Sequence, residues 1–189
     1  MNRFFRQFLK DPLITGAIAP SSAGLSELIT DTAQLPEKKC VVELGSGTGV
    51  FTKRILKKIS PDCIFFTLEI NPKLADETKK NCPAAIVYPA SGKDIRKYLR
   101  KHRQRTCDCI ISGLPWAAFS HKAQEELLGA VYSSLEYGGE FLTFAYIHGL
   151  LLPAGKKFRR LLKERFSSVK KTRIIWGNLP PAFVYHCKK

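Results

Sequence analysis

The fold of this chain is decided by the stretch Val41-Val42-Glu43-Leu44-Gly45-Ser46-Gly47-Thr48-Gly49-Val50-Phe51-Thr52. Two β-branched residues and a leucine lead into three glycines at alternate positions, and a run with helical periodicity, residues 51–59, follows at once. This order predicts a buried parallel strand, a tight glycine turn and a helix whose free N-terminal amides point back at the turn. Because glycine lets the backbone approach a ligand closely, the stretch predicts a ligand-binding loop rather than an ordinary turn.

The spacing of the glycines and of two acids indicates which ligand binds. The pattern is G-x-G-x-G, not the G-x-G-x-x-G of dinucleotide folds, and Glu43 stands where it would repel a pyrophosphate but suit an ammonium group. Glu69 ends the next apolar run, 20 residues after Gly49, where a carboxylate can accept two ribose hydroxyls. Together these features resemble the S-adenosylmethionine site of class I methyltransferases. That resemblance implies that Glu43 holds the amino-acid end of the donor, and that the donor site comprises Glu43, Gly45, Ser46, Gly47, Thr48, Gly49, Glu69 and Ile70.

Strand-like and helix-like segments alternate from residue 40 onward, which predicts a mostly parallel sheet with helices on both faces. Only five residues separate the last two strands, so these should be antiparallel neighbours. The prediction is therefore an α/β, Rossmann-like class I methyltransferase fold with a seven-stranded sheet and an antiparallel last strand. The expected strands are 40–44, 64–69, 85–88, 107–112, 140–147, 170–176 and 182–187, and the expected helices are 51–59, 72–80, 93–103, 120–135 and 155–166.

Composition and net charge predict the number of domains, the kind of binding partner and the cellular compartment. The 189 residues suit one domain, with an N-terminal helix and lid at 1–35 and the donor-binding part at 36–189. A net charge of +15 predicts attraction to nucleic acid or to an anionic membrane, and charge alone does not choose between them. The six cysteines lack metal-ligand spacing, so we expect no metal and a reducing cytosol. With no signal peptide and no membrane-spanning run, we expect a cytoplasmic protein that meets the inner face of the membrane from its surface.

Three basic segments are candidates for that contact. Residues 3–10 place aromatic and aliphatic side chains at helical spacing between basic ones, which fits either a helix packed on the domain or a basic helix lying in a membrane interface. Two further segments, 93–105 and 156–173, are also strongly basic. The small-residue segment 15–22 is either a lid over the donor or a linker that caps a helix.

Residues at the ends of the third and fourth strands should face the ligand crevice of an open α/β sheet. The methyltransferase resemblance implies that Asp94 meets the adenine while Ser91 and Gly92 shape the turn; the alternative for Asp94 is a plain acid at a helix start. The next strand ends in Ser112-Gly113-Leu114-Pro115-Trp116, of which Ser112 and Gly113 would contact the donor and Leu114, Pro115 and Trp116 the acceptor.

Amino-methylating relatives carry Asn where this chain has Gly113 and Tyr where it has Trp116. Without that amide, a nucleobase or glutamine amine would lack its hydrogen-bond acceptor. An indole face suits an alkylammonium cation, so Trp116 is predicted to line the pocket; the alternative is a buried tryptophan. Tyr146 and Asn178 are further candidate acceptor contacts. Tyr146, His148 or a water molecule is the candidate proton acceptor, although a lone histidine is more often structural.

Four strings narrow the resemblance: residues 15–22, 43–50, 112–116 and 178–182. Together they resemble the bacterial soluble-type phospholipid N-methyltransferases, over nearly the whole chain. This resemblance implies stepwise methylation of the amine of phosphatidylethanolamine, with S-adenosylmethionine as the donor, at an anionic membrane surface. The family is similar to ribosomal-RNA adenine dimethyltransferases, so RNA N-methylation is the alternative, and a non-catalytic donor-binding protein is the third.

Overall fold

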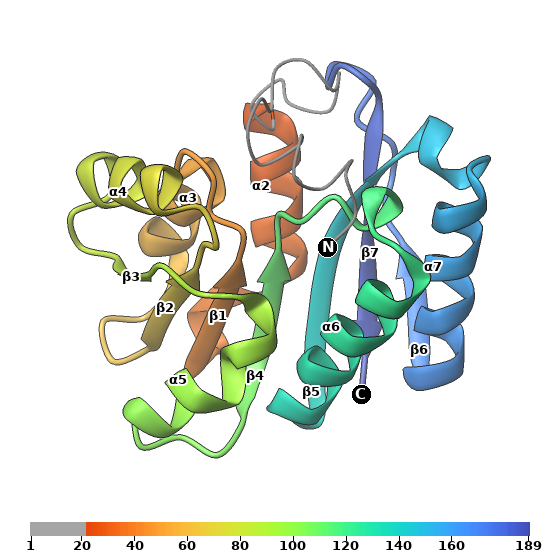
Figure 1. Cartoon of the computed structure of the whole chain (residues 1–189). Coiled ribbons are helices and arrows are strands. Elements are labelled where there is room, and N and C mark those ends of the chain that lie inside the picture. Colours follow the sequence, from red (N-terminus) through yellow and green to blue (C-terminus); the bar gives the residue numbers. More distant parts are fainter. Residues whose placement is uncertain (1–21) are drawn as a thin grey trace.

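The computed structural model describes residues 22–189 (Figure 1). The helix predicted at residues 3–10 and the lid predicted at residues 15–22, except Ser22, lie outside this range.

The described residues form one seven-stranded sheet in the order β3-β2-β1-β4-β5-β7-β6 (Figure 1). β1 to β5 pair in parallel, whereas β7 runs antiparallel to both β5 and β6. The architecture confirms the predicted fold class, including the antiparallel last strand. The strands are β1 Cys40–Leu44, β2 Ile64–Leu68, β3 Ile86–Tyr88, β4 Cys107–Ser112, β5 Leu135–Tyr146, β6 Ser168–Lys171 and β7 Ala182–Lys188.

Helices follow the strands and cover both faces of the sheet. The α-helices are α2 Ala23–Thr32, α3 Val50–Lys58, α4 Pro72–Asn81, α5 Ile95–Lys101, α6 His121–Ser134 and α7 Pro153–Arg165. Short 3-10 helices are η1 Leu35–Glu37, η2 Gly92–Asp94, η3 Trp116–Ala118 and η4 Ile147–Leu150.

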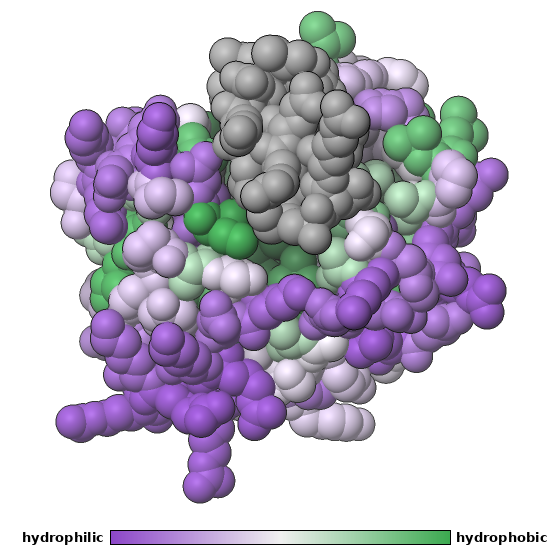
Figure 2. Space-filling view, viewed as in Figure 1, coloured by the Kyte–Doolittle hydropathy of each residue, from purple (hydrophilic) through white to green (hydrophobic). Residues whose placement is uncertain are grey.

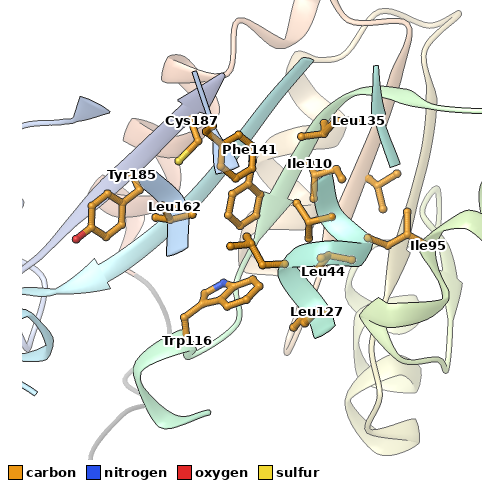
Figure 3. Close-up of a cluster of buried hydrophobic side chains, with 14 of the residues drawn as sticks. Leu44, Ile95, Ile110, Trp116, Leu127, Leu135, Phe141, Leu162, Tyr185 and Cys187 are labelled. Carbon is orange, nitrogen blue, oxygen red and sulfur yellow. The ribbon is translucent and has the colours of Figure 1, made fainter. Parts of the chain in front are cut away.

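Each face of the sheet carries its own apolar cluster, because successive side chains of a strand point to opposite faces. Val41 of β1 packs in a cluster with α2 and α3, to which Leu25 and Ile55 contribute. Its neighbour Val42 belongs to the cluster under α5, α6 and α7, part of which Figure 3 shows around Leu44. Burying one large aliphatic side chain stabilises the fold by about 1.5–3 kcal/mol, so the apolar periodicity decides which face each helix covers.

Two expected elements end differently in the structure. β6 stops at Lys171 instead of continuing to residue 176, because the hydroxyl of Thr172 accepts the Val184 N–H at 2.9 Å, and only Ile175 pairs again, with Ala182. The helix expected at 93–103 is split into η2 and the shorter α5.

Within residues 22–189, no helix is long and apolar enough to cross a membrane, and no three His, Cys, Asp or Glu side chains gather as a metal site would require. All six cysteines are free.

Candidate active site

The glycine loop lies at the carboxyl end of β1, where the order of strands reverses between β1 and β4. Gly45, Gly47 and Gly49 have φ of +75°, +58° and +91°, which side chains with a Cβ rarely adopt. A side chain at Gly45 would also come within 2.6 Å of Leu114. The alternate glycines therefore serve backbone geometry, and Gly49 is the residue that caps α3.

Helix α4 holds this loop in place. The Thr78 hydroxyl donates to the carbonyl of Gly47 at 2.8 Å and lies 3.0 Å from the hydroxyl of Ser46. The Asn81 amide donates to the carbonyl of Thr48 at 2.9 Å. Ser46 and Thr48 thus belong to the loop but are engaged by α4, a contact that the sequence analysis did not anticipate.

Glu69 is fixed at the end of β2 by backbone donors. Its Oε2 accepts the Gly47 N–H at 3.0 Å and its Oε1 accepts the Asn71 N–H at 2.9 Å. Burial raises the pKa of Glu69, and these backbone hydrogen bonds oppose the rise. Each carboxylate oxygen keeps a further lone pair that can accept a ligand hydroxyl.

Glu43 is fully buried beside the loop. The Thr52 hydroxyl donates to Oε2 at 2.7 Å, whereas Oε1 has no hydrogen bond from any residue in the described range. Burial raises the pKa of Glu43 to about 7, although the hydrogen bond from the Thr52 hydroxyl acts to lower it. Burying an acid with one unpaired oxygen costs free energy of folding. This cost favours a cationic ligand, or a ligand bound through water, beside Glu43.

A cavity of about 520 Å³ opens beside Gly45, between the ends of β1 and β2 and the start of α6. Among the predicted donor and acceptor residues, its walls include Gly45, Ile70, Ser91, Gly92 and Leu114. The far wall comes from the start of α6 and includes an ion pair between Lys93 and Glu126, which the sequence analysis missed. The helical periodicity of residues 121–134 was visible, but nothing local showed that this face would meet the cavity.

Asp94 is exposed at the N-terminal end of α5, next to the cavity wall that Ser91, Gly92 and Lys93 form, and is not itself part of that wall. Its contact with the adenine stays a prediction.

Gly113 stands at a point where two loops nearly touch. Its N–H donates to the carbonyl of Leu44 at 2.8 Å, and a Cβ there would lie 2.6 Å from the carbonyl oxygen of Gly45. The Asn of amino-methylating relatives cannot be placed here without moving this backbone. Ser112, also predicted, is fully buried and accepts the Trp116 indole N–H at 3.0 Å.

Trp116 belongs to the buried apolar cluster that Figure 3 shows. Its side chain is 2% exposed, one face stacks on Phe158 of α7 with ring centroids 4.5 Å apart, and Phe119 and Phe141 meet it edge to face. Trp116 is also in the wall of the second cavity described below, as expected of a pocket residue, and its contact with an alkylammonium stays a prediction.

A second cavity of about 290 Å³ lies across the β4–η3 loop from the first. Its walls are mainly apolar and come from η3, the end of β5, η4 and α7, with Pro115 and the edge of Trp116 on one side. Tyr146 and His148 both line it, and their rings lie parallel with centroids 5.6 Å apart. The hydroxyl of Tyr185, also in the wall, is buried without a hydrogen bond from the described residues.

Asn178 does not reach either cavity. Its Oδ1 accepts the Ser22 N–H at 3.0 Å and its amide donates to the carbonyl of Pro180 at 2.7 Å. The bond to Ser22 fastens the loop before β7 to the start of α2, and the bond to Pro180 closes that loop on itself. The acceptor contact of Asn178 stays a prediction.

Comparisons with known proteins bear on this geometry. No model of a known protein family matches the chain. The ornithine lipid N-methyltransferase of Singulisphaera acidiphila is 29% identical over 188 residues, covering 98% of this chain and 94% of that protein. The O-methyltransferase from Bacillus cereus in complex with SAH superposes with a TM-score of 0.73 at 15% identity, covering 100% of this chain and 92% of that one. The O-methyltransferase TomG from Streptomyces achromogenes, in complex with SAM, gives a TM-score of 0.71 at 15% identity, covering 100% and 91%.

The chain has the Rossmann-like fold of class I methyltransferases. In this class I methyltransferase fold, the residues at the donor end fit S-adenosylmethionine. The unpaired Oε1 of Glu43 suits an ammonium or its bound water, and Glu69 retains capacity for two hydroxyls. The apolar side chains of Ile70 and Leu114 on the wall of the larger cavity suit a flat base.

Proposed function

We propose that the chain is an S-adenosylmethionine-dependent N-methyltransferase that methylates the amine of a membrane aminolipid. The observation that carries the proposal is the pair of cavities that meet at the loop of residues 112–116, one bounded by the glycine loop and one by aromatic walls. The relative from Singulisphaera acidiphila supports the acceptor class. Phosphatidylethanolamine and its methylated intermediates are the acceptors predicted from the sequence, and ornithine lipid is the one named for that relative.

The chain's own residues bind, orient and exclude water. S-adenosylmethionine, when bound, supplies a methyl group already activated on a sulfonium, so positioning should provide most of the rate. Glu43 and Glu69 fix the two ends of the donor, and Gly113 allows the loop after β4 to approach the glycine loop closely. The mainly apolar second cavity would desolvate the acceptor amine, and its aromatic walls would face a cation.

The amine must lose a proton before its nitrogen can attack. Burial raises the pKa of Tyr146, so this phenol stays protonated at neutral pH and is a poor base. His148 is exposed in the same wall, against the Tyr146 ring. We therefore assign proton acceptance to His148, with Tyr146 orienting the amine. Replacement of a general base lowers the rate by about 10²–10⁴-fold, so H148A should show such a loss while Y146F keeps more activity.

The test is methyl transfer from labelled S-adenosylmethionine to three acceptors offered separately. These are vesicles of phosphatidylethanolamine with phosphatidylglycerol, vesicles of ornithine lipid with phosphatidylglycerol, and total RNA. Label in a lipid fraction supports the proposal and identifies the headgroup. Label in RNA alone overturns it and would give the +15 net charge another role.

Two variants make the assay specific. Glu69→Ala should abolish donor binding measured by calorimetry and, with it, transfer to every acceptor. Glu37→Ala is the matched control, since this exposed acid of η1 lines neither cavity, and it should retain both. Unchanged donor affinity in Glu69→Ala would remove Glu69 from the donor site.

A further inference from the structure

Exposed apolar side chains gather where the chain leaves the carboxyl ends of β5 and re-enters β7. Five large ones are exposed here, and we call them the apolar rim: Leu151 (75%), Leu152 (44%), Ile174 (38%), Trp176 (72%) and Leu179 (80%). Figure 2 shows apolar side chains at the top and upper right of the molecule, where Figure 1 places the β6–β7 connection and the start of α7.

The two segments of the rim are neighbours through the sheet. Tyr146, the last residue of β5, pairs with Ala182, the first of β7, and the Ile147 N–H donates to the carbonyl of Pro181 at 3.0 Å. The β6–β7 connection is held internally by Ile175 paired with Ala182 and by the hydrogen bond from Asn178 to Pro180, and the Asn178 Oδ1 joins it to Ser22 before α2. Trp176 and Leu179 are therefore presented on an ordered loop.

The apolar rim continues into the second cavity, where we propose that the acceptor amine binds. Leu152 is exposed and also lines that cavity, beside His148. An apolar chain lying on the rim would lead directly to the place where the amine is held.

Positive charge flanks the rim on both segments. Exposed basic side chains lie on α7, on β6 and in the residues that connect β6 to Ile174. They are Lys156, Lys157, Arg159, Arg160, Lys163, Lys170, Lys171 and Arg173. In this stretch of α7, Arg160 is paired with Glu164. Burial and the nearby charges of Arg159 and Lys163 lower the pKa of Lys171, which indicates that α7 and β6 form one cationic surface.

We propose that the apolar rim is a membrane-docking surface that inserts Trp176 and Leu179 into an anionic lipid bilayer, with the basic side chains of α7 and β6 against the headgroups. This inference rests on the proposed function and adds the surface from which the lipid enters. Tryptophan favours the membrane interface, and basic side chains beside it attract anionic lipid. A surface that only binds the phosphates of nucleic acid needs basic side chains but no exposed leucines. The exposed leucines of the apolar rim therefore favour a lipid bilayer as the partner.

The fluorescence of Trp176 can report contact between the apolar rim and a bilayer. Its two tryptophans differ sharply, since Trp116 is 2% exposed and Trp176 is 72% exposed. With the full chain and vesicles of phosphatidylcholine and phosphatidylglycerol, we expect a blue shift of the emission and quenching by brominated acyl chains. W176F should lose both signals, and vesicles of phosphatidylcholine alone should produce little of either.

Variants quantify the contribution of the rim. Leu179→Ser should weaken vesicle binding by about tenfold, the cost of withdrawing one aliphatic side chain from the apolar phase. Tyr137→Ser is the matched control, because Tyr137 is 95% exposed near the other end of β5 and should leave binding unchanged. Unshifted Trp176 emission in protein that sediments with vesicles would overturn the proposal. So would a shift that depends only on protein concentration or on RNA, pointing to a second copy or to nucleic acid.

The experiments distinguish a failure of the docking proposal from a failure of the proposed function. If Trp176 inserts but no aminolipid is methylated, even dispersed in detergent, the proposed function is wrong and the docking surface stands. If methylation in detergent and on vesicles is equal and Leu179→Ser changes neither, the docking surface is wrong and the function stands.

Discussion

At the scale of single residues, Glu43 links the donor site to stability. Its pKa in the folded protein is about 7 because the side chain is fully buried, whereas an unfolded glutamate has a pKa of about 4.3. The folded state therefore holds this proton more tightly. The resulting stabilisation is complete below about pH 4 and is lost as the pH rises through 7, and it is at most about 4 kcal/mol.

Glu43→Gln should remove that pH dependence. Relative to the natural chain, the free energy of unfolding of the variant should rise between pH 5 and pH 8, while its affinity for S-adenosylmethionine falls because a neutral amide cannot balance an ammonium. Urea unfolding at both pH values and calorimetry measure the two effects. Glu164→Gln, which changes an exposed acid on α7, is the control. Parallel pH profiles for the natural chain and Glu43→Gln would contradict the assignment.

Gly113 is the residue where two loops approach most closely. Gly113→Ala should lower the free energy of unfolding by about 1–3 kcal/mol and weaken donor binding, because its Cβ would meet the Gly45 carbonyl at 2.6 Å. Gly177→Ala is the matched control, since a Cβ there has open space, and it should leave stability within about 0.5 kcal/mol. Thermal unfolding with and without S-adenosylhomocysteine compares them, and equal effects of the two changes would refute the close-approach argument.

At the scale of elements, the site depends on α4 as much as on the glycine loop. Thr78→Val keeps the shape of this buried side chain but removes the hydroxyl that bonds to Gly47. We expect a loss of about 1–2 kcal/mol in stability and a raised KM for the donor, because the loop is no longer held in its binding geometry.

The matched control is Thr32→Val in α2, which removes a similar hydroxyl-to-carbonyl hydrogen bond, to Leu28, away from the loop. It should cost comparable stability without changing the KM. If both variants shift the KM alike, the effect belongs to general loosening of the fold and not to the contact between α4 and the loop.

At the scale of the whole molecule, Glu140 joins distant parts of the chain. It accepts hydrogen bonds from Lys38, just before β1, at 2.6 Å and from His186 on β7 at 2.9 Å. Burial opposes its ionisation, but these two partners outweigh burial and lower the pKa of Glu140. Its contribution to stability is therefore present above the unfolded pKa and lost as the pH falls through the lower folded pKa.

Glu140→Gln should destabilise the protein by about 1–3 kcal/mol at pH 7, with the difference disappearing on acidification. Chemical unfolding between pH 3 and pH 7 measures this. Asp76→Asn, which breaks an exposed pair with Lys79, should change stability little at any pH. A constant penalty for Glu140→Gln down to the lowest pH would show that its charge is not involved.

The sequence by itself determined the central strand, the glycine loop, the following helix and the two acids, Glu43 and Glu69, that lie beside the loop. These are local properties, because a short run of β-branched and apolar residues, left-handed glycines and an acid near a strand end depend on near neighbours in the chain. The antiparallel pairing of the last strands was equally readable, because the connection is too short for a crossover helix. It is ten residues long, 172–181, and not the expected five.

Only the tertiary structure decided what surrounds Trp116 and Asn178. Trp116 is covered by Phe158 from α7 and Asn178 is bonded to Ser22, partners that no local pattern identifies. The two cavities and the apolar rim likewise arise where segments distant in sequence meet at the carboxyl ends of the strands. Backbone conformation is set largely by adjacent residues, whereas burial and pairing of a side chain depend on which distant elements pack against it.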